Sequence, residues 1–248
     1  MAVNLIRAGT NDLWQKASEL LLNQLKTTLK EKKKCLLLLS GGSAVNICYS
    51  LAEYIKKAQI GSDILAIGQV DERFIPKNHE SGIKNQESAR DLINSPINAV
   101  NIRNSGLIDI LKEKNIPFYK IPQEGMLQEA ADFYNRQLEE LFKKYTFRMA
   151  VLGIGRDGHT AGFLPGYKKM WDKERFAAGY ENLGQFPRRI TVTPLVIRKL
   201  DYALVAVSGN EKKEVLQKIL NKGSDDINRL PGLLVHEIKE ADLVTDCL

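Results

Sequence analysis

Short apolar runs recur along the chain, and each one ends abruptly in a polar or glycine-rich turn. Between them lie amphipathic segments whose apolar residues return every three or four positions, as in a helix that packs on one face. The apolar runs are residues 35–39, 64–70, 147–152 and 202–207, and the amphipathic segments are residues 11–29, 45–55, 127–144 and 211–220. Strands that alternate with helices in this way predict an α/β fold: a mostly parallel twisted sheet flanked by helices on both faces.

Weaker patterns complete the expected order of elements. Additional strands are expected at residues 4–7, 118–121, 189–192, 233–235 and 243–244, and additional helices at residues 85–93 and from Pro194. Residues 167–187 have little periodicity and are expected to form a loop with a short strand. Because the chain shows no repeat, low-complexity tract or linker, we expect one domain that spans residues 1–248.

Composition and charge exclude several classes of protein. Hydrophobic residues make up 44% and charged residues 27% of the chain, which is typical of a globular protein. No apolar run approaches the roughly 20 residues that cross a membrane, and the first residues lack the pattern of a signal peptide, so we expect a cytoplasmic protein with no membrane partner. The net charge of +6 is spread among acidic residues, and the basic run at 30–34 is typical of a solvated helix end. This pattern favours a small anionic ligand and no nucleic acid.

The spacing of cysteines and histidines argues against a metal centre. Neither residue type has the spacing of metal ligands; the residues are Cys35, Cys48, Cys247, His79, His159 and His236. We interpret the cysteines as reduced thiols and expect neither a metal nor another cofactor. The sequence leaves the oligomeric state open, and a monomer or weak dimer is the expectation.

Polar residues gather where four of the expected strands end. The carboxyl ends of parallel strands meet at one edge of a sheet, and ligands of open α/β sheets bind there. The motifs are Ser40-Gly-Gly-Ser43, Asp71-Glu-Arg73, Gly153 to His159, and Ser208-Gly209. Their convergence predicts a ligand site at this edge.

The glycine turn between the first long strand and its helix suits an anion. Gly41 and Gly42 have no Cβ, so backbone N–H groups could approach an anion at the start of the helix, and Ser43 could add a hydroxyl donor. An ordinary tight turn with a serine cap explains the same residues equally well.

Two charged motifs could also contact a phosphorylated substrate. The guanidinium of Arg73 can bind phosphate, and the carboxylate of Asp71 can hold a substrate hydroxyl. A structural ion pair is the simpler interpretation of that motif alone. Arg189 follows Arg188 at the start of an apolar strand, where an arginine faces an anion or merely lies at the surface.

His159 is the best candidate for a catalytic group. Imidazole titrates near neutral pH, so a histidine in a polar turn at a strand end can act as a general base, and Asp157 is near enough to set its environment. His79 and His236 have no comparable setting. Gly153 to Gly158 match the G-x-G-x-x-G dinucleotide motif, but no long helix follows it, so we do not expect a nucleotide site.

Together these residues resemble the 6-phosphogluconolactonase family, within the superfamily that includes the glucosamine-6-phosphate deaminases. The resemblance covers most of the chain in order: LLLLSGGS (36–43), VDERFIP (70–76), NQESARDLI (85–93), LGIGRDGHTAGFLPG (152–166), RRITVT (188–193), VAVSGNEKKEVL (205–216) and LPGLLV (230–235). The second and fourth segments are specific, and the others support them. The resemblance implies a Rossmann-like fold and metal-independent hydrolysis of a sugar phosphate lactone, that of 6-phosphogluconate, in the oxidative pentose phosphate pathway.

The resemblance also implies roles for single residues. His159 is the implied base that activates water against the lactone carbonyl. Asp71 and Asp157 would position sugar hydroxyls or the histidine. The implied phosphate and substrate contacts are Gly41, Gly42, Ser43, Arg73 and Arg189.

Three departures from the family pattern are visible. Ala44 and Val45 replace the usual threonine and proline after the glycine turn, which removes a hydroxyl that would bind phosphate. Lys84 stands where a serine usually precedes the asparagine at position 85. Gly162-Phe163-Leu164 replaces a serine, leucine and phenylalanine. None of these changes removes the base.

Two other functions remain as alternatives. Deaminases of the superfamily typically carry a tyrosine where this chain has Arg73, and a glutamate for ring opening where it has Leu164. A non-catalytic sensor of sugar phosphates would keep the pocket, but such sensors commonly carry a DNA-binding domain, and no helix-turn-helix module is visible before the first strand. The residues Asp157-Gly158-His159 also favour turnover, so we expect a lactonase.

Overall fold

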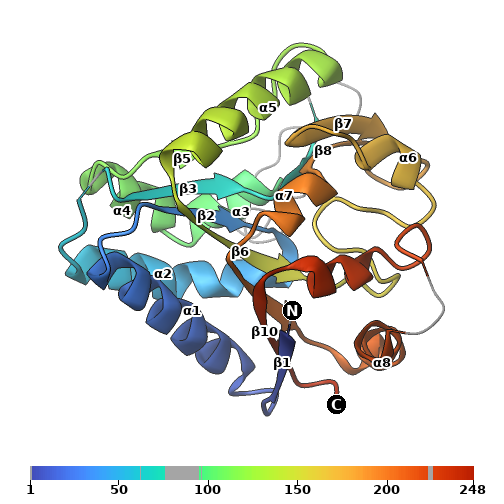
Figure 1. Ribbon diagram of the computed structural model, residues 1–248, viewed down its shortest axis with the longest axis horizontal. Helices are drawn as coiled ribbons and strands as arrows, with labels where there is room; N and C mark the ends of the chain where they lie inside the picture. The colour runs from blue at the N-terminus through green and yellow to red at the C-terminus, as the bar shows by residue number, and fades with distance from the viewer. Residues whose placement is uncertain (1, 62, 76–94, 96, 223–225) are drawn as a thin grey trace.

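A parallel sheet forms the centre of the computed structural model, which describes residues 2–61, 63–75, 95, 97–222 and 226–248. Within these residues the sheet has seven strands in the order β1-β10-β9-β6-β2-β3-β5 (Figure 1). All of its pairings are parallel. The strands are β1 (Ala2–Arg7), β2 (Cys35–Leu39), β3 (Leu65–Gln69), β5 (Phe118–Tyr119), β6 (Phe147–Gly153), β9 (Tyr202–Val207) and β10 (Glu240–Thr245). The expected α/β fold is confirmed.

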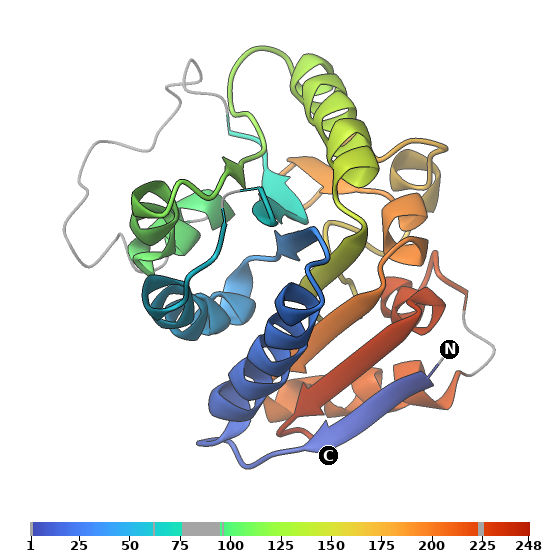
Figure 2. The ribbon, with the colours of Figure 1, turned by 60° about the vertical axis from the view of Figure 1, so that its left-hand side comes forward.

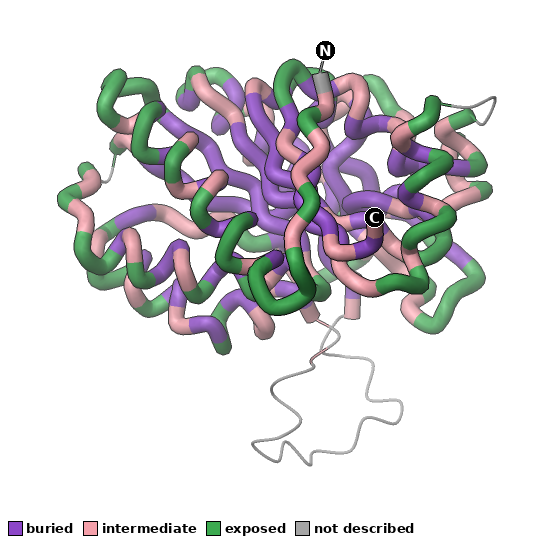
Figure 3. Tube along the Cα trace, turned by 90° about the horizontal axis from the view of Figure 1, so that it is seen from below, coloured by how far each residue is buried: buried purple, intermediate pink, exposed green. Residues whose placement is uncertain are grey.

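Helices cover both faces of this sheet. One face packs on α1 (Leu13–Lys30), α2 (Asn46–Lys57) and α4 (Leu107–Glu113), and the other packs on α5 (Leu127–Lys144), α7 (Pro194–Arg198) and α8 (Lys213–Asn221). In Figure 2, α1 lies in blue across the face turned to the viewer. Figure 3 shows the buried strands in purple between partly exposed helices.

Burial on both faces explains why the strands read as continuous apolar runs. Successive side chains of a strand point to opposite faces. On β2, Leu36 and Leu38 therefore join the core that includes Tyr134 of α5, and Leu37 and Leu39 join the core on the α1 side. Every residue of the strand is buried, as is typical of central parallel strands.

A second, antiparallel sheet of three strands lies beside the first and was not expected. Its order is β4-β8-β7, with β4 (Asp71–Arg73), β8 (Arg188–Val192) and β7 (Ala177–Glu181). The sequence pattern of residues 71–73 predicts only a polar end of β3, because three residues are too few to show a strand period. Val70 connects the two sheets, because its N–H donates to Leu39 O and its carbonyl accepts from Val192 N–H. The chain thus passes directly from one sheet into the other at the edge where the site was predicted.

Other segments differ from expectation in smaller ways. Residues 233–235 are not a strand but belong to the 3-10 helix η4 (Pro231–Glu237), which Gly232 N–H ties to Gly158 O. Leu234 and Val235 are buried within that helix, so their apolar character reflects core packing. Within 167–187 the structure has α6 (Lys168–Trp171) as well as the short strand β7.

The region after β4 holds helices that the sequence analysis did not identify. The expected helix at 85–93 lies outside the described residues. The structure has α3 (Asn98–Asn104) and then α4, separated by Gly106 in a left-handed conformation. No helix in the described part of the chain is long and apolar enough to cross a membrane.

Candidate active site

A cavity of about 250 Å³ lies at the carboxyl ends of β2 and β6, where β4 and β8 meet the parallel sheet. Three of the four strand-end motifs and Arg189 contribute to its lining, and Ser208-Gly209 does not. The lining consists of Ser40, Gly41, Gly42, Ser43, Asp71, Arg73, Asn98, Gly153, Ile154, Gly155, His159, Ala161, Arg189 and Lys212. Of the predicted site residues, only Asp157 is absent from the lining, and it contacts His159. The structure therefore brings all of the predicted site residues together.

His159 and Asp157 form a hydrogen-bonded pair at the mouth of this cavity. His159 Nδ1 lies 2.5 Å from Asp157 Oδ1, and the same oxygen accepts from the His159 backbone N–H at 3.1 Å. A carboxylate at Nδ1 favours the tautomer that carries its proton there, which leaves Nε2 with a free lone pair. Although burial raises the pKa of Asp157, hydrogen bonds from His159 lower it below its usual value. The pair can therefore accept a proton at Nε2.

The turn that carries this pair depends on two glycines. A Cβ at Gly155 would lie 2.2 Å from His159 Nδ1, so only glycine lets the imidazole lie against the turn. Gly158 has φ +81°, and a Cβ there would also lie 2.4 Å from Leu230 Cδ1. The turn is closed by the Gly155 N–H, which donates to His159 O at 2.8 Å. These contacts hold the imidazole in one position before any ligand binds.

The two glycines after β2 are needed for different reasons. Gly42 has φ +60°, which favours glycine. Gly41 has φ −90°, which any residue adopts, but a Cβ there would lie 1.8 Å from Asn98 Oδ1. Ser40 Oγ, at the same turn, is buried and has no hydrogen-bond partner among the described residues. The turn thus offers close backbone approach and an unused hydroxyl.

Arg73 and Arg189 lie directly opposite each other in the β4–β8 pair. Like charges in such a pair destabilise a sheet, and burial together with the charge of Arg189 lowers the pKa of Arg73. The Arg73 guanidinium stacks on the Phe186 ring at 4.6 Å, and Arg189 Nη1 lies 3.9 Å from Asp71 Oδ2. Two guanidinium groups at one cavity form a site for a multiply charged anion.

Asp71 places a carboxylate between these cations and the histidine. Burial raises its pKa, and the charges of Arg189, Arg73 and His159 lower it in part. Its carboxylate can accept hydrogen bonds from ligand hydroxyls. The cavity therefore contains a cationic part, an acceptor and a base.

Sequence reasoning missed two polar residues of the cavity lining that lie outside the predicted motifs, Lys212 and Asn98. Lys212 lies in the 3-10 helix η3 (Asn210–Lys212), just after the Ser208-Gly209 turn that the sequence analysis identified. A lysine so close to a strand-end turn was a usable signal. Asn98 begins α3, and no local pattern marks it, because its place depends on contacts with β4.

The structure also shows the surroundings of two more residues that the sequence singles out, Gly162 and His236. A Cβ at Gly162 would lie 2.6 Å from Thr191 Cβ, so glycine fits this departure from the family pattern. His236 Nε2 contacts Ile219 O at 2.8 Å, and burial lowers its pKa, which indicates a structural role. His79 and Lys84 lie outside the described residues. The described residues contain no group of three or more His, Cys, Asp or Glu side chains that could hold a metal.

Glu72, between Asp71 and Arg73, gives a test of the buried charge beside the cavity. Burial raises its pKa from 4.5 to about 7, although hydrogen bonds from Asn98, Ala99 and Gln69 favour the ionised form. A carboxyl group with a raised pKa stabilises the fold most below pH 4.5, and that contribution is lost as the pH rises through about 7.

We therefore expect the free energy of unfolding to fall between pH 5 and pH 8 by an amount on the order of 3 kcal/mol from this group. The dependence should become shallower in Glu72→Gln, measured by urea unfolding at each pH. The pH dependence of the free energy of unfolding that remains in Glu72→Gln is attributed to Asp71, whose pKa is also raised. Equal slopes in the two proteins would contradict the assignment.

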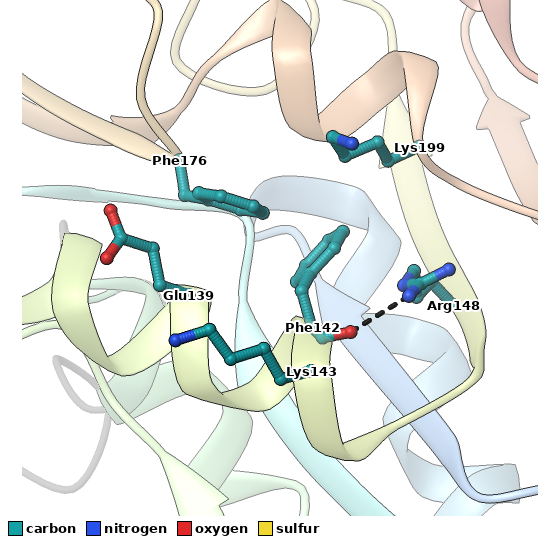
Figure 4. A pocket seen from close by; sticks show the side chains of 6 residues that line it. All are labelled: Glu139, Phe142, Lys143, Arg148, Phe176 and Lys199. Atoms are coloured by element: carbon teal, nitrogen blue, oxygen red, sulfur yellow. Dashed lines mark hydrogen bonds between the residues drawn. The ribbon is translucent and has the colours of Figure 1, made fainter.

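A larger hollow, of about 470 Å³, lies between α5, β6 and α7 and contains none of the predicted site residues (Figure 4). Its lining consists of Glu139, Phe142, Lys143, Arg148, Phe176 and Lys199. Arg148 donates to Phe142 O, and Glu139 accepts from Asn135. With no histidine and no glycine turn, it is a weaker candidate for catalysis.

Comparisons with known proteins agree with the fold and with the family that the sequence resembles. Residues 8–244 match the family described as glucosamine-6-phosphate isomerases/6-phosphogluconolactonase. The chain is 30% identical over 206 residues to the 6-phosphogluconolactonase of Homo sapiens, covering 79% of this chain and 72% of that protein. It is also 30% identical over 113 residues to that of Rattus norvegicus, where the match covers 44% of this chain and only 43% of the relative. The match to the Chlamydia trachomatis protein likewise spans 45% of its length.

Solved structures show the same fold at lower identity. A 6-phosphogluconolactonase from Thermotoga maritima superposes with a TM-score of 0.77 at 20% identity, covering 98% of this chain and 99% of that one. The enzyme from Trypanosoma brucei superposes with a TM-score of 0.74 at 18% identity, covering 99% and 97%. At such identities the likeness establishes the architecture.

Proposed function

We propose that this chain, which belongs to the family of glucosamine-6-phosphate isomerases and 6-phosphogluconolactonases, hydrolyses 6-phospho-D-glucono-1,5-lactone to 6-phosphogluconate. This reaction is the lactonase step of the oxidative pentose phosphate pathway. The observation that carries the proposal is the pairing, in one cavity, of two opposed arginines with an oriented histidine. In this proposal the two arginines bind the phosphate of the substrate, and the histidine activates water.

The proposed chemistry needs only groups that line the cavity or contact its lining. His159 Nε2 takes a proton from water as the water oxygen attacks the lactone carbonyl carbon. The ring C–O bond then breaks, and the departing ring oxygen takes the proton back from the His159 imidazolium. The carboxylic acid that forms loses its proton to solvent, which leaves a carboxylate, a hydroxyl and one released proton. Asp157 stabilises the imidazolium that forms, because its own carboxylate stays ionised near neutral pH.

The phosphate is assigned to the cationic part of the cavity. Arg73 and Arg189 provide charge and hydrogen-bond donors from β4 and β8, and Lys212 adds a third cation from the turn after β9. The backbone of Gly41, Gly42 and Ser43 adds N–H donors at the start of a helical segment. Asp71 is left to accept hydrogen bonds from sugar hydroxyls.

The lactonase proposal is tested by hydrolysis of freshly prepared 6-phosphoglucono-δ-lactone, followed by proton release at constant pH. We expect the chain to accelerate the reaction well above its spontaneous rate, because general-base catalysis contributes on the order of 10²–10⁴-fold. Ammonia release from glucosamine 6-phosphate, measured in parallel, should stay at background, because Leu164 supplies no carboxylate for ring opening. Binding of sugar phosphates without turnover of either substrate would favour a sensor instead.

We further propose a cytoplasmic enzyme that works as a monomer or weak dimer, with a sugar phosphate lactone as its partner and no nucleic acid. Cys35, Cys48 and Cys247 support the cytoplasmic location, because all three are buried free thiols, as is usual in a reducing compartment. Sedimentation velocity at micromolar concentration tests the oligomeric state, and a stable higher oligomer would contradict it.

A further inference from the structure

The carboxylate of Glu72 is fully buried at the junction of β4, α3 and β3. Its Oε1 accepts from the backbone N–H groups of Asn98 at 2.8 Å and Arg73 at 3.0 Å. Its Oε2 accepts from Ala99 N–H and from Gln69 Nε2, both at 2.8 Å. Four donors thus converge on one carboxylate that does not line the cavity.

These bonds join segments that are far apart in the sequence. Gln69 also accepts from Ile121 N–H at 2.8 Å, which links the network to the segment after β5. Because Glu72 binds the first two N–H groups of α3, it sets the position at which that helix begins. The residue at that position is Asn98.

The two polar atoms of the Asn98 amide differ in their hydrogen bonding. Its Nδ2 donates to Asp71 O at 3.0 Å, which fixes the orientation of the amide. Its Oδ1 packs against Gly41 and accepts no hydrogen bond from any described residue. Asn98 is only 3% exposed and lines the cavity, so this acceptor is presented to a ligand rather than to bulk water.

A neutral carbonyl oxygen in this position selects for hydroxyl donors. Phosphate oxygens are mostly deprotonated at neutral pH and act as acceptors, whereas each ring hydroxyl of a sugar lactone has a proton to donate. Asn98 Oδ1 and the Asp71 carboxylate are two acceptors in a cavity whose lining also includes Arg73, Arg189 and Lys212. The cavity thus offers acceptors for hydroxyls as well as cations for phosphate.

We propose that Asn98 is a substrate-binding residue whose Oδ1 accepts a hydrogen bond from one ring hydroxyl, and that buried Glu72 is the residue that positions it. This inference rests on the proposed function, since it assigns a hydroxyl of the lactone. It adds a selectivity that the arginines and the histidine do not supply. Glu72 acts through Asn98 and never touches the substrate.

The test compares the lactone with its 2-, 3- and 4-deoxy analogues, each of which lacks one ring hydroxyl. In the wild type, removal of the bound hydroxyl should lower kcat/KM about 5- to 10-fold, the loss of one net hydrogen bond. Asn98→Ala should lower kcat/KM for the parent by the same factor, and one deoxy analogue should then react as well as the parent. Equal losses toward all four lactones, or no loss, would overturn the assignment.

Asn101→Ala is the matched control on the same helix. Asn101 Nδ2 donates to Ser95 O at 2.8 Å and does not line the cavity. Asn101→Ala removes a hydrogen bond that anchors α3 but keeps the acceptor Asn98 Oδ1. The wild-type preference among the four lactones should therefore persist. If Asn101→Ala erased the preference as Asn98→Ala does, the effect would be structural.

Glu72→Gln tests the positioning role. A glutamine would aim its own N–H groups at two of the four donors, so the start of α3 should shift and the hydroxyl preference should be lost as in Asn98→Ala. Retention of the preference in a folded Glu72→Gln protein would refute the role of Glu72. Asn98→Ala still tests the binding half if Glu72→Gln does not fold.

A binding measurement separates this inference from the lactonase proposal. Calorimetry with glucose 6-phosphate and its 2-, 3- and 4-deoxy analogues reports the same hydroxyl preference without turnover. A wild type that shows the preference but hydrolyses no lactone refutes the lactonase and leaves the Asn98 assignment standing. Hydrolysis of the lactone without any hydroxyl preference would refute the Asn98 assignment and leave the lactonase proposal standing.

Discussion

His159→Ala is expected to lower kcat for lactone hydrolysis at least tenfold, and on the order of 10²–10⁴-fold if the imidazole is the general base. The side chain is half-buried and lies against the turn of Gly155, while the core packing around β6 does not involve it. The fold should therefore survive, which circular dichroism and the melting temperature check. Unchanged turnover in a folded variant would remove His159 from its assigned role.

Two further variants refine this test, one at Asp157, which contacts the proposed base, and one at a histidine that does not line the cavity. Asp157→Asn should reduce kcat less than His159→Ala, because it keeps an acceptor near Nδ1 but loses the charge that stabilises the imidazolium. His236→Gln is the control, since His236 Nε2 contacts Ile219 O and His236 is not among the residues that line the cavity. A comparable loss in His236→Gln would point to general instability.

The second large effect is expected at the opposed arginines. Arg73→Met or Arg189→Met should raise KM about 10- to 100-fold with a smaller change in kcat, because a hydrogen bond to a charged group contributes about 1.5–3 kcal/mol. The effect falls on KM if the phosphate is bound equally well in the ground and transition states. Steady-state kinetics at several lactone concentrations separates the two constants.

Arg188→Met is the matched control for charge. Arg188 is next to Arg189 on β8 but stacks on the Phe74 ring at 5.7 Å and does not line the cavity. Its replacement removes one positive charge from the same strand, so KM should change little. A similar rise in KM for Arg188→Met would mean that overall charge, and not the arginine pair, attracts the substrate.

The arginine pair also predicts behaviour that does not depend on catalysis. Inorganic phosphate should raise the melting temperature of the wild type by mass action and should do so much less in Arg73→Met. Without phosphate, removal of one of two opposed like charges should not lower the melting temperature. Equal stabilisation by phosphate in both proteins would place the anion elsewhere.

Local features of the site were accessible from the sequence. The apolar run of β2 and the periodicity of α5 depend on neighbouring residues, and so they predicted those elements correctly. His159 and Asp157 are two residues apart in a glycine turn, so their contact is local as well. The position of each motif at a strand end followed from the topology of parallel sheets.

What the sequence did not reveal depends on long-range register. Arg73 faces Arg189 only because β4 leaves the parallel sheet and pairs with β8 in an antiparallel one, a choice made by the packing of the whole core. Asn98 lies at the cavity where α3 is tied to β4, by the Glu72 carboxylate and by the Asn98 Nδ2–H that donates to Asp71 O. No period or neighbouring residue marks such contacts, since their free energy arises between segments that the chain brings together only on folding.

The sequence by itself therefore determined the α/β architecture and the histidine–aspartate pair, because hydrophobic periodicity and short-range turns carry that information. The tertiary structure alone decided which cations oppose each other, which asparagine lines the cavity, and why Gly41 and Gly162 must be glycine. At each of those glycines a side chain from a neighbouring segment or turn occupies the space that a Cβ would need.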